Sequence, residues 1–461
     1  MVAVVLPALA APAIGDLIIR TRDGDVYTIP VTPQELESIE FRQGPPGTHF
    51  KADSLKSAPE APPPAAGDGT PAPKAQTPDF EAPKAKPKAP VPGTGARRTL
   101  HTVWRIGPGK PFERPSEVAR KVGDGDTVEI EGGLYEGDYV VWRQNDLTLR
   151  GVNGRPHLKA VGPIPNGKAI WVIGGDRVKV ENIEFSHAAV PDRNGAGIRA
   201  EGGDLTIRDS YFHHNENGVL AGRLSQATIV IENSEFAYHD CKNRSGSAHG
   251  IYVGGIRRFA LVNSHVHHTC SGHQVKTRAH RNEIRYNRLL DYDDGSASYA
   301  VDMPNCGISV VMGNLIHKGR RRENEAALSY GAEGCGNRDK GLWVVGNTMV
   351  SMARSAMLLR NHSLTPAVLA NNLVVGATAL SLGPVDDRGN VVVKAERFRS
   401  PGDWDFRLAP GAAAIDAGVD LPPVEGRPLV PVSEPISPLT LRPRRIVGKI
   451  DAGAFEFRAG E

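Results

Sequence analysis

Along most of the chain, apolar and polar residues alternate in short segments, and one phrase recurs: apolar-x-apolar-x-Asn-x-x-apolar. Clear copies read VKVENIEF, LTIRDSYF, IVIENSEF and FALVNSHV. The fifth position of the copies holds, in order, Asn182, Asp209, Asn233, Asn263, Asn287, Asn314, Asn347 and Asn372. The steps average about 27 residues, a period typical of repeat proteins. The pattern therefore predicts a stack of similar units, each built on a short strand that ends at a turn.

A single strand of this kind is too short to bury its hydrophobic face. Copies stacked about 4.8 Å apart satisfy the backbone hydrogen bonds at one another's strand edges and enclose a continuous apolar interior. Asn suits the position beside the turn, because it tolerates left-handed dihedral angles and its amide can bond to the Asn above and below. A leucine-rich repeat would be dominated by Leu, and a β-propeller would have four strands per period. We therefore predict an all-β fold, a parallel β-helix of roughly ten coils.

Two segments that flank the repeats carry a family resemblance. The opening IGPGKPFERPSEVARKVGDGDTVEIEGGLYEG, Ile106 to Gly137, resembles the start of right-handed parallel β-helix proteins of the pectate-lyase-like superfamily, in which an N-terminal helix caps the first coil. The closing DWDFRLAPGAAAIDAG, Asp403 to Gly418, is similar to the terminal module of many exported β-helix proteins. The resemblance implies a right-handed β-helix over about residues 98–457. The function has to be argued from the site, because this fold serves many chemistries.

Composition changes several times along the chain. The apolar N-terminus resembles a signal peptide without its charged start. An alternating segment around Asp23-Gly24 predicts a hairpin. A Pro- and Ala-rich stretch that follows cannot bury a core. We expect a signal-peptide remnant at 1–13, a small β module at 14–43, a linker at 44–98, the β-helix domain at 99–400 and a C-terminal capping segment at 401–461. The apolar start predicts a periplasmic or secreted protein.

Charge and composition narrow the function classes. Among 461 residues, 55 Lys and Arg face 52 Asp and Glu, a net charge of +3 that is too small to mark a nucleic-acid binder. Hydrophobic residues make up 40% and charged residues 23%, ordinary values for a folded protein. No stretch of about 18 consecutive apolar residues occurs, so we expect no transmembrane segment. The oligomeric state stays open.

Four cysteines recur near the coil period. Cys241, Cys270, Cys306 and Cys335 are separated by 29, 36 and 29 residues, so the members of each close pair fall in the same turn of adjacent coils. An even number in a chain with an export signal predicts two disulfides, Cys241–Cys270 and Cys306–Cys335. Four cysteines allow three connectivities, and buried free thiols are the alternative. A zinc site is less favoured, because no CxxC pair is present.

Strand register predicts where polar chemistry gathers. The apolar residues Ile251, Val275, Val301 and Leu328 are expected to point inward from successive coils. Side chains alternate along a strand, so the residue after each of them points outward. The expected outward column is Tyr252, Lys276, Asp302 and Ser329, with Arg199 and Arg360 extending it and Arg278 beside Lys276. Three further residues, His249, His273 and Tyr299, reach this face only where the strands begin after them.

This column predicts chemistry on an acidic polysaccharide. Cleavage of a uronide by β-elimination needs a cation on the C6 carboxylate, a base for H5 and an acid for the leaving oxygen. The candidate bases are Lys276 and His273, the candidate acids Tyr252 and Tyr299, and the candidate cations Arg278 and Arg199; His249 is grouped with these catalytic candidates. The expected substrate-binding residues are Arg199, Asp302, Glu325 and Arg360.

A second resemblance concerns the segment HQVKTRAHRNEIRYNRLLD, His273 to Asp291. It is similar to the strand of chondroitinase-B-like and alginate-lyase-like β-helix lyases, in which an outward Lys acts as base shortly before a ladder Asn. The resemblance implies that Lys276 is the base and that Asn287 lies in the ladder. Two departures weaken it: the interval from Lys to Asn is longer here, and Asp302 stands where those lyases carry Arg.

Other interpretations stay open. A glycoside hydrolase on the same scaffold would pair Asp302 with Asp240 or Glu325, and a non-catalytic carbohydrate-binding or envelope protein would use the N-terminal module as a tether. No cofactor is certain, and calcium stays open as a cofactor, although it finds no clear carboxylate nest beyond DYDD at Asp291. The run HVHH at residues 265–268 is expected to be a solvated turn and not a transition-metal site, because no fourth ligand is evident.

Overall fold

The computed structural model describes residues 101–460, except 243–245, 322, 354, 424–425 and 427. It also describes the backbone of two strands nearer the N-terminus, β1 (Gly15–Arg20) and β2 (Val26–Val31), which pair antiparallel. These strands fall within the expected small β module. The expected signal-peptide remnant and linker lie outside the described residues.

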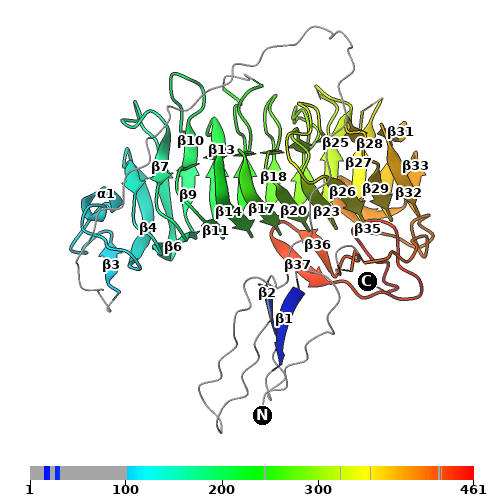
Figure 1. Cartoon of the computed structure of the whole chain (residues 1–461), viewed down its shortest axis with the longest axis horizontal. Helices are drawn as coiled ribbons and strands as arrows, with labels where there is room; N and C mark the ends of the chain where they lie inside the picture. The colour runs from blue at the N-terminus through cyan, green and yellow to red at the C-terminus, as the bar shows by residue number, and fades with distance from the viewer. Residues whose placement is uncertain are drawn as a thin grey trace, which may run out of the picture. The chain divides into compact units, whose positions relative to one another are not determined.

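Strands of successive coils pair in parallel and form two long sheets (Figure 1). The ten-stranded sheet consists of β5 (Val140–Trp142), β7 (Ala169–Ile173), β10 (Ala196–Ala200), β13 (Asn217–Ala221), β16 (Ile251–Val253), β19 (Val275–Thr277), β22 (Val301–Met303), β25 (Ala326–Tyr330), β28 (Met357–Asn361) and β31 (Ala379–Leu382). The prediction of an all-β parallel solenoid of about ten turns is confirmed.

The 21-stranded sheet takes two strands from most coils. It consists of β3 (Val103–Ile106), β4 (Thr127–Glu136), β6 (Thr148–Lys159), β8 (Val178–Glu181), β9 (Glu184–Ser186), β11 (Leu205–Arg208), β12 (Tyr211–His213), β14 (Leu224–Glu232), β15 (Glu235–Ala237), β17 (Ile256–Val262), β18 (His265–His267), β20 (Arg281–Arg285), β21 (Arg288–Leu290), β23 (Ile308–Met312), β24 (Leu315–Lys318), β26 (Gly341–Val345), β27 (Thr348–Ser351), β29 (Ala367–Ala370), β30 (Leu373–Val375), β32 (Val385–Arg388) and β33 (Val391–Val393).

The hydrophobic core is a set of columns that run through the coils. Phe185, Phe212 and Phe236 occupy one register position in three successive strands and are fully buried. Their rings stack with centroids 5.0 and 4.7 Å apart. Because each coil repeats the inward positions of the last, burial continues from one coil to the next and the interior stays apolar.

A polar ladder runs beside these columns. Its members are Ser210, Ser234, Ser264, Asn287, Asn314, Asn347, Asn372 and Asn390. Each side-chain oxygen accepts a hydrogen bond from a backbone N–H of the preceding coil, as Asn314 Oδ1 does from the N–H of Asn287 at 2.8 Å. The ladder thereby satisfies backbone groups that are buried at the turn.

The predicted alignment of the repeats is wrong by one residue in its first half. The early repeat residues Asn182, Asp209, Asn233 and Asn263 have φ values of 55°, 52°, 49° and 46° and form the turn itself. The ladder residue follows them, so Ser264 and not Asn263 is in register with Asn287. Asn satisfies both the left-handed turn and the inward ladder, which is why the sequence pattern merges the two positions.

The ends of the solenoid are irregular. The first strand of the solenoid, β3, pairs with β4 and precedes the short helix α1 (Pro115–Val118). At the other end lie η1 (Pro401–Asp403) and two antiparallel pairs, β34 (Phe398–Ser400) with β35 (Asp405–Leu408) and β36 (Ser433–Ser437) with β37 (Thr440–Pro443). Within the described part of the chain, no helix has the length and apolar character needed to cross a bilayer.

Both predicted disulfides are present. Cys241 pairs with Cys270 and Cys306 pairs with Cys335, each across 29 residues. Each bond joins turns of neighbouring coils, with Cα atoms 4.8 and 4.9 Å apart.

Candidate functional site

The predicted outward column lies on the ten-stranded sheet. Tyr252 pairs in register with Lys276, Lys276 with Asp302, and Asp302 with Ser329. Their inward neighbours, among them Val275 and Val301, are fully buried. Alternation along each strand therefore places these side chains together on the outer face.

An ion cluster forms around the ammonium group of Lys276. Lys276 Nζ lies 3.5 Å from Asp302 Oδ2 and 3.0 Å from Glu333 Oε1. The other oxygen of Glu333 lies 2.7 Å from an Arg278 guanidinium nitrogen. The Glu333 carboxylate is thus held between two cations, and its side chain is 41% exposed. Lys276 and Arg278 thus hold one carboxylate, that of Glu333, between them.

Arg278 is positioned by two further contacts. Its Nε donates a hydrogen bond to the Tyr252 hydroxyl at 3.0 Å, and another guanidinium nitrogen donates to Asn305 Oδ1 at 2.5 Å. Because the Tyr252 oxygen accepts from Arg278, the Tyr252 proton is left to point elsewhere. The Cys306–Cys335 disulfide lies beside this contact, one residue after Asn305 and two after Glu333.

The two histidines of the face stack in parallel. His249 and His273 precede strands β16 and β19, so they lie in turns and reach the outer face, and their ring centroids are 4.8 Å apart. The Nδ1 atom of His249 accepts the backbone N–H of His273 at 3.0 Å, and Nδ1 of His273 accepts that of Tyr299 at 3.3 Å. Each neutral ring therefore carries its proton on Nε2.

These contacts set the protonation state of His273. Its Nε2 lies 3.5 Å from Asp302 Oδ2, where the N–H can donate. Burial and the nearby charge of Lys276 lower the pKa of His273 to about 3. Burial, with the charges of His273 and Lys276, holds the pKa of His249 well below its usual value. With Nδ1 occupied and Nε2 protonated, the neutral ring of His273 presents an N–H, and not a lone pair, toward Asp302.

The remaining column residues extend the face in both directions. The Tyr299 hydroxyl lies beside Ser329 and Arg360, and burial and the charge of Asp302 raise the pKa of Tyr299. Arg360 pairs with Ser329 in register. In the other direction, Arg199 continues the column beyond Leu220 and lies 3.8 Å from Glu201. Two arginines therefore flank the central cluster.

The two carboxyl groups that contact Lys276 have pKa values shifted in opposite directions. Burial raises the pKa of Asp302, whose side chain is only 4% exposed, although Lys276 opposes the shift. Burial also acts on Glu333, but its hydrogen bonds and charge contacts with Arg278 and Lys276 outweigh it and lower the pKa. Such a split is typical of sites in which one carboxyl group holds a proton more readily than its neighbour.

Three acidic candidates make contacts of their own, outside the ion cluster at Lys276. The Glu325 carboxylate accepts a hydrogen bond from the Ser355 hydroxyl at 2.8 Å. Asp240 is buried in the turn after β15. Asp291 accepts the backbone N–H groups of Ala297 and Gly319, and burial raises its pKa to about 6. Since its carboxylate is already bound by backbone donors, the acidic run does not fit the open nest that calcium requires.

Sequence reasoning missed Glu333 and Asn305. Both lie outside strands, so the alternation of side chains does not place them. The cysteines are the available signal, because Asn305 directly precedes Cys306 and Glu333 lies two residues before Cys335. A disulfide that spans two coils brings the residues beside its cysteines over the face between them.

Comparisons with known proteins agree with this fold. A model of the right-handed β-helix region matches residues 140–373. Pectate lyase Pel9A is 14% identical with a TM-score of 0.55, over 78% of this chain and 97% of Pel9A. An alginate lyase from Paenibacillus sp. str. FPU-7 is 11% identical with a TM-score of 0.38, over 61% of this chain and 96% of the lyase. No curated protein matches the sequence.

The structural likeness to Pel9A, at this low identity, establishes the fold alone. The family model covers half of the chain and includes the coils that carry Tyr252, Lys276 and Asp302. Parallel strand pairing, the apolar columns and the polar ladder are the physical basis of that match. The chain belongs to the right-handed β-helix family.

Proposed function

We propose that this protein cleaves an acidic, uronate-containing polysaccharide by β-elimination on the face that carries Lys276. One observation carries the proposal: a carboxylate, that of Glu333, is bound between Lys276 and Arg278. A uronate carboxylate has the same charge and the same two oxygens. A substrate that displaced Glu333 would meet the same paired cations, with the Tyr252 hydroxyl on the adjacent coil.

We assign one residue to each step of the elimination. Arg278 binds the C6 carboxylate and stabilises the negative charge that develops when H5 leaves. Lys276 takes H5 as a neutral amine, after passing its own proton to Asp302, the buried carboxylate 3.5 Å away. Asp302 suits this exchange because burial raises its pKa. His273 holds Asp302 from the other side with its Nε2–H.

The leaving group receives its proton from Tyr252. The C5–H electron pair forms the C4–C5 double bond, the C4–O4 bond breaks, and the Tyr252 hydroxyl donates to O4. Arg278, 3.0 Å from the phenol oxygen, stabilises the phenolate that results. The proton taken by Lys276 then returns to Tyr252 through solvent, so the enzyme ends the cycle unchanged. Arg199 and Arg360, further along the column, bind neighbouring uronates.

The two disulfides support the proposal that the protein acts outside the cytoplasm. Two disulfides persist in oxidising compartments and are rare where thiols are kept reduced. Polymeric acidic sugars are found in the same places. One structure with the same fold is a pectate lyase. We therefore propose a periplasmic or secreted enzyme.

The test is the ultraviolet absorbance of the unsaturated uronate, measured with the purified protein on a panel of polyuronates and bacterial exopolysaccharides. We expect the signal to grow with the wild type and to fall at least about 100-fold with Lys276→Ala, as for loss of a general base. Lys179→Ala, an exposed lysine on β8, is the matched control and should keep full activity. Absence of both absorbance and new reducing ends across the panel would contradict the proposal.

A glycoside hydrolase is the second candidate, and it rests on the opposite pKa shifts of Asp302 and Glu333. Both carboxyl groups contact one ammonium, so two carboxyl groups with different proton affinities lie close together, as hydrolysis of a glycosidic bond requires. Asp302 would be the general acid and Glu333 the nucleophile or base. This enzyme would release saturated reducing ends without ultraviolet absorbance, and Asp302→Asn would stop it.

A further inference from the structure

A second polar face lies on the 21-stranded sheet, apart from the column that carries Lys276. One outward column there reads His157, Glu184, Tyr211, Glu235 and His265 from coil to coil. The neighbouring outward position, two residues further along the strands, holds His213 and His267. Two carboxylates are therefore each flanked by two imidazoles, and a tyrosine separates the two groups.

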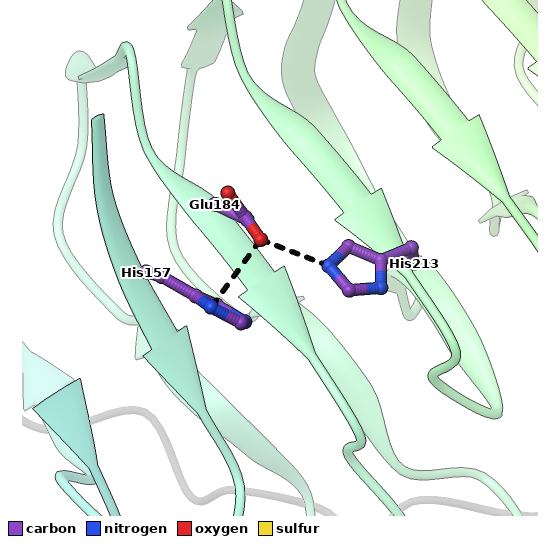
Figure 2. Close-up of side chains that lie close together, drawn as sticks. All are labelled: His157, Glu184 and His213. Atoms are coloured by element: carbon purple, nitrogen blue, oxygen red, sulfur yellow. Dashed lines mark hydrogen bonds and ion pairs between the residues drawn. The ribbon is translucent and has the colours of Figure 1, made fainter. Parts of the chain in front are cut away.

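The first group is the triad of His157, Glu184 and His213, on the adjacent strands β6, β9 and β12. One oxygen of Glu184 lies 3.3 Å from His157 Nδ1 and 3.0 Å from His213 Nε2. Figure 2 shows the carboxylate between the two rings, which point toward it from either side. The three side chains are 13–24% exposed, so an ion from solvent can reach them.

The second group is the triad of Glu235, His265 and His267, two coils further on. Glu235 Oε1 lies 3.0 Å from His267 Nε2, the same contact that Glu184 makes with His213. His265 is directly across from Glu235 in register. It is 4% exposed, and its buried Nδ1 has no hydrogen-bond partner among the described residues. A buried imidazole nitrogen without a partner is costly unless something binds it.

The expectation of a solvated turn at residues 265–268 is therefore wrong. His265 and His267 belong to a strand, β18, and both are buried. The ring of Tyr292 packs edge-on against both of them, at 6.1 and 5.8 Å between centroids. Only His268 occupies the turn, with a φ of 49°.

Outside each triad, one further histidine contacts one of the triad's imidazoles, His214 at the first triad and His268 at the second. His213 Nδ1 lies 2.8 Å from His214 Nδ1, and His267 Nδ1 lies 2.6 Å from His268 Nδ1. When the inner histidine donates in this bond, its Nε2 becomes a bare lone pair that faces a carboxylate oxygen at 3.0 Å. Two acceptors at that distance need a cation between them. A metal-bound imidazole usually donates its other N–H to an acceptor, and the outer imidazole can be that acceptor here.

The distances suit a metal ion. Zinc binds imidazole nitrogen at about 2.0–2.1 Å and carboxylate oxygen at about 2.0–2.2 Å, which puts tetrahedral ligand atoms about 3.3 Å apart. The nitrogen-to-oxygen distances here are 3.0 to 3.3 Å, and all three ligand atoms of each triad lie within 4.8 Å of one another.

We propose that the two triads, His157–Glu184–His213 and Glu235–His265–His267, each bind one divalent transition-metal ion of the zinc class. Two imidazoles and one carboxylate leave a fourth position open, to water or to an anionic ligand. Nitrogen ligands favour zinc, nickel, cobalt or copper over calcium or magnesium. The sites stand apart from the proposed elimination chemistry and do not depend on it.

The test is zinc stoichiometry of the full chain, measured by equilibrium dialysis after chelator treatment. We expect two ions per chain for the wild type, one for Glu184→Gln, one for Glu235→Gln and none that is tight for the double variant. Each substitution keeps the size of the side chain while removing its charge, and should weaken its site at least about 100-fold. His280→Gln, an exposed histidine outside both triads, is the matched control and should keep two ions.

Cobalt gives an independent readout. Four-coordinate cobalt absorbs strongly in the visible range, so the wild type should show these bands and each single variant about half their intensity. Circular dichroism verifies that the variants are folded. Fewer than two ions in the wild type would overturn the proposal, as would two ions retained by either single variant or an equal loss in His280→Gln.

Discussion

The Glu333 carboxylate occupies the position that we assign to the substrate carboxylate, so its removal should strengthen substrate binding. Glu333→Gln keeps the shape of the side chain and removes the charge that pairs with Lys276 and Arg278. The ion pairs are partly exposed, and such pairs are worth about 0.2–1 kcal/mol each. Displacing Glu333 therefore costs the substrate about 1 kcal/mol, which corresponds to about fivefold in affinity.

The assay is the initial rate of unsaturated-uronate formation as a function of polymer concentration. We expect the Glu333→Gln variant to show a KM about fivefold lower than the wild type, with kcat little changed. The difference should shrink as salt is added, because screening weakens the competing ion pairs. Glu323→Gln, another exposed glutamate, is the matched control and should leave KM unchanged.

The same variant separates the two candidate functions. If Glu333 were the nucleophile or base of a hydrolase, its amide would stop turnover and could not lower KM. A turnover rate that drops by about 100-fold or more, or a rise in KM, would refute the view of Glu333 as an internal competitor. The unfolding free energy should fall by only about 1 kcal/mol, so a much larger loss would show that Glu333 is mainly structural.

Contacts elsewhere in the coils lead to three more predictions. Cys306→Ser and Cys241→Ser each open a loop of equal length, so both should lower the unfolding free energy by about 3–4 kcal/mol. Only Cys306→Ser should reduce elimination activity, because it frees Asn305 and Glu333. Equal activity in the two variants would contradict this. Asn314→Leu should cost about 3–5 kcal/mol in urea unfolding, because it strands the N–H and amide of the preceding ladder residue, and a loss below about 1 kcal/mol would show that the ladder is not stabilising. The pKa of Asp291 is raised to about 6, so between about pH 4 and pH 6 the folded state holds a proton that the unfolded state has lost. The unfolding free energy should therefore fall as pH rises through this range, by at most about 1.4 kcal/mol per pH unit. Asp291→Asn should flatten this slope.

The sequence was sufficient for the parts of the molecule that repeat. Alternation along short strands identified Ile251 and Val275 as inward residues and Tyr252 and Lys276 as their outward neighbours. That inference needs only the period of a strand and a constant step between coils. It also located both disulfides, because a disulfide between adjacent coils repeats the coil period.

What the sequence did not yield depends on contacts between coils and loops. Glu333 reaches Arg278 from a loop whose path is set by a disulfide, and no periodic pattern marks it. The tautomer of His273 depends on a backbone N–H from the next coil, that of Tyr299. The burial of His265 depends on the ring of Tyr292, which is 27 residues away. Each of these features depends on three-dimensional packing between coils, and no local pattern of residue types predicts it.

The polar ladder has a direction, and this bears on how the chain is made. Each rung supplies the acceptor for the coil before it, as Asn314 does for Asn287. During synthesis from the N-terminus, the newest coil therefore carries bare donors until the following coil emerges to accept them. Folding on the ribosome would add coils one at a time, each incomplete until the next arrives. In the described residues the series ends at Asn390, whose amide donates to the carbonyl of Leu369 in the preceding coil, as the amide of Asn372 does to Val344.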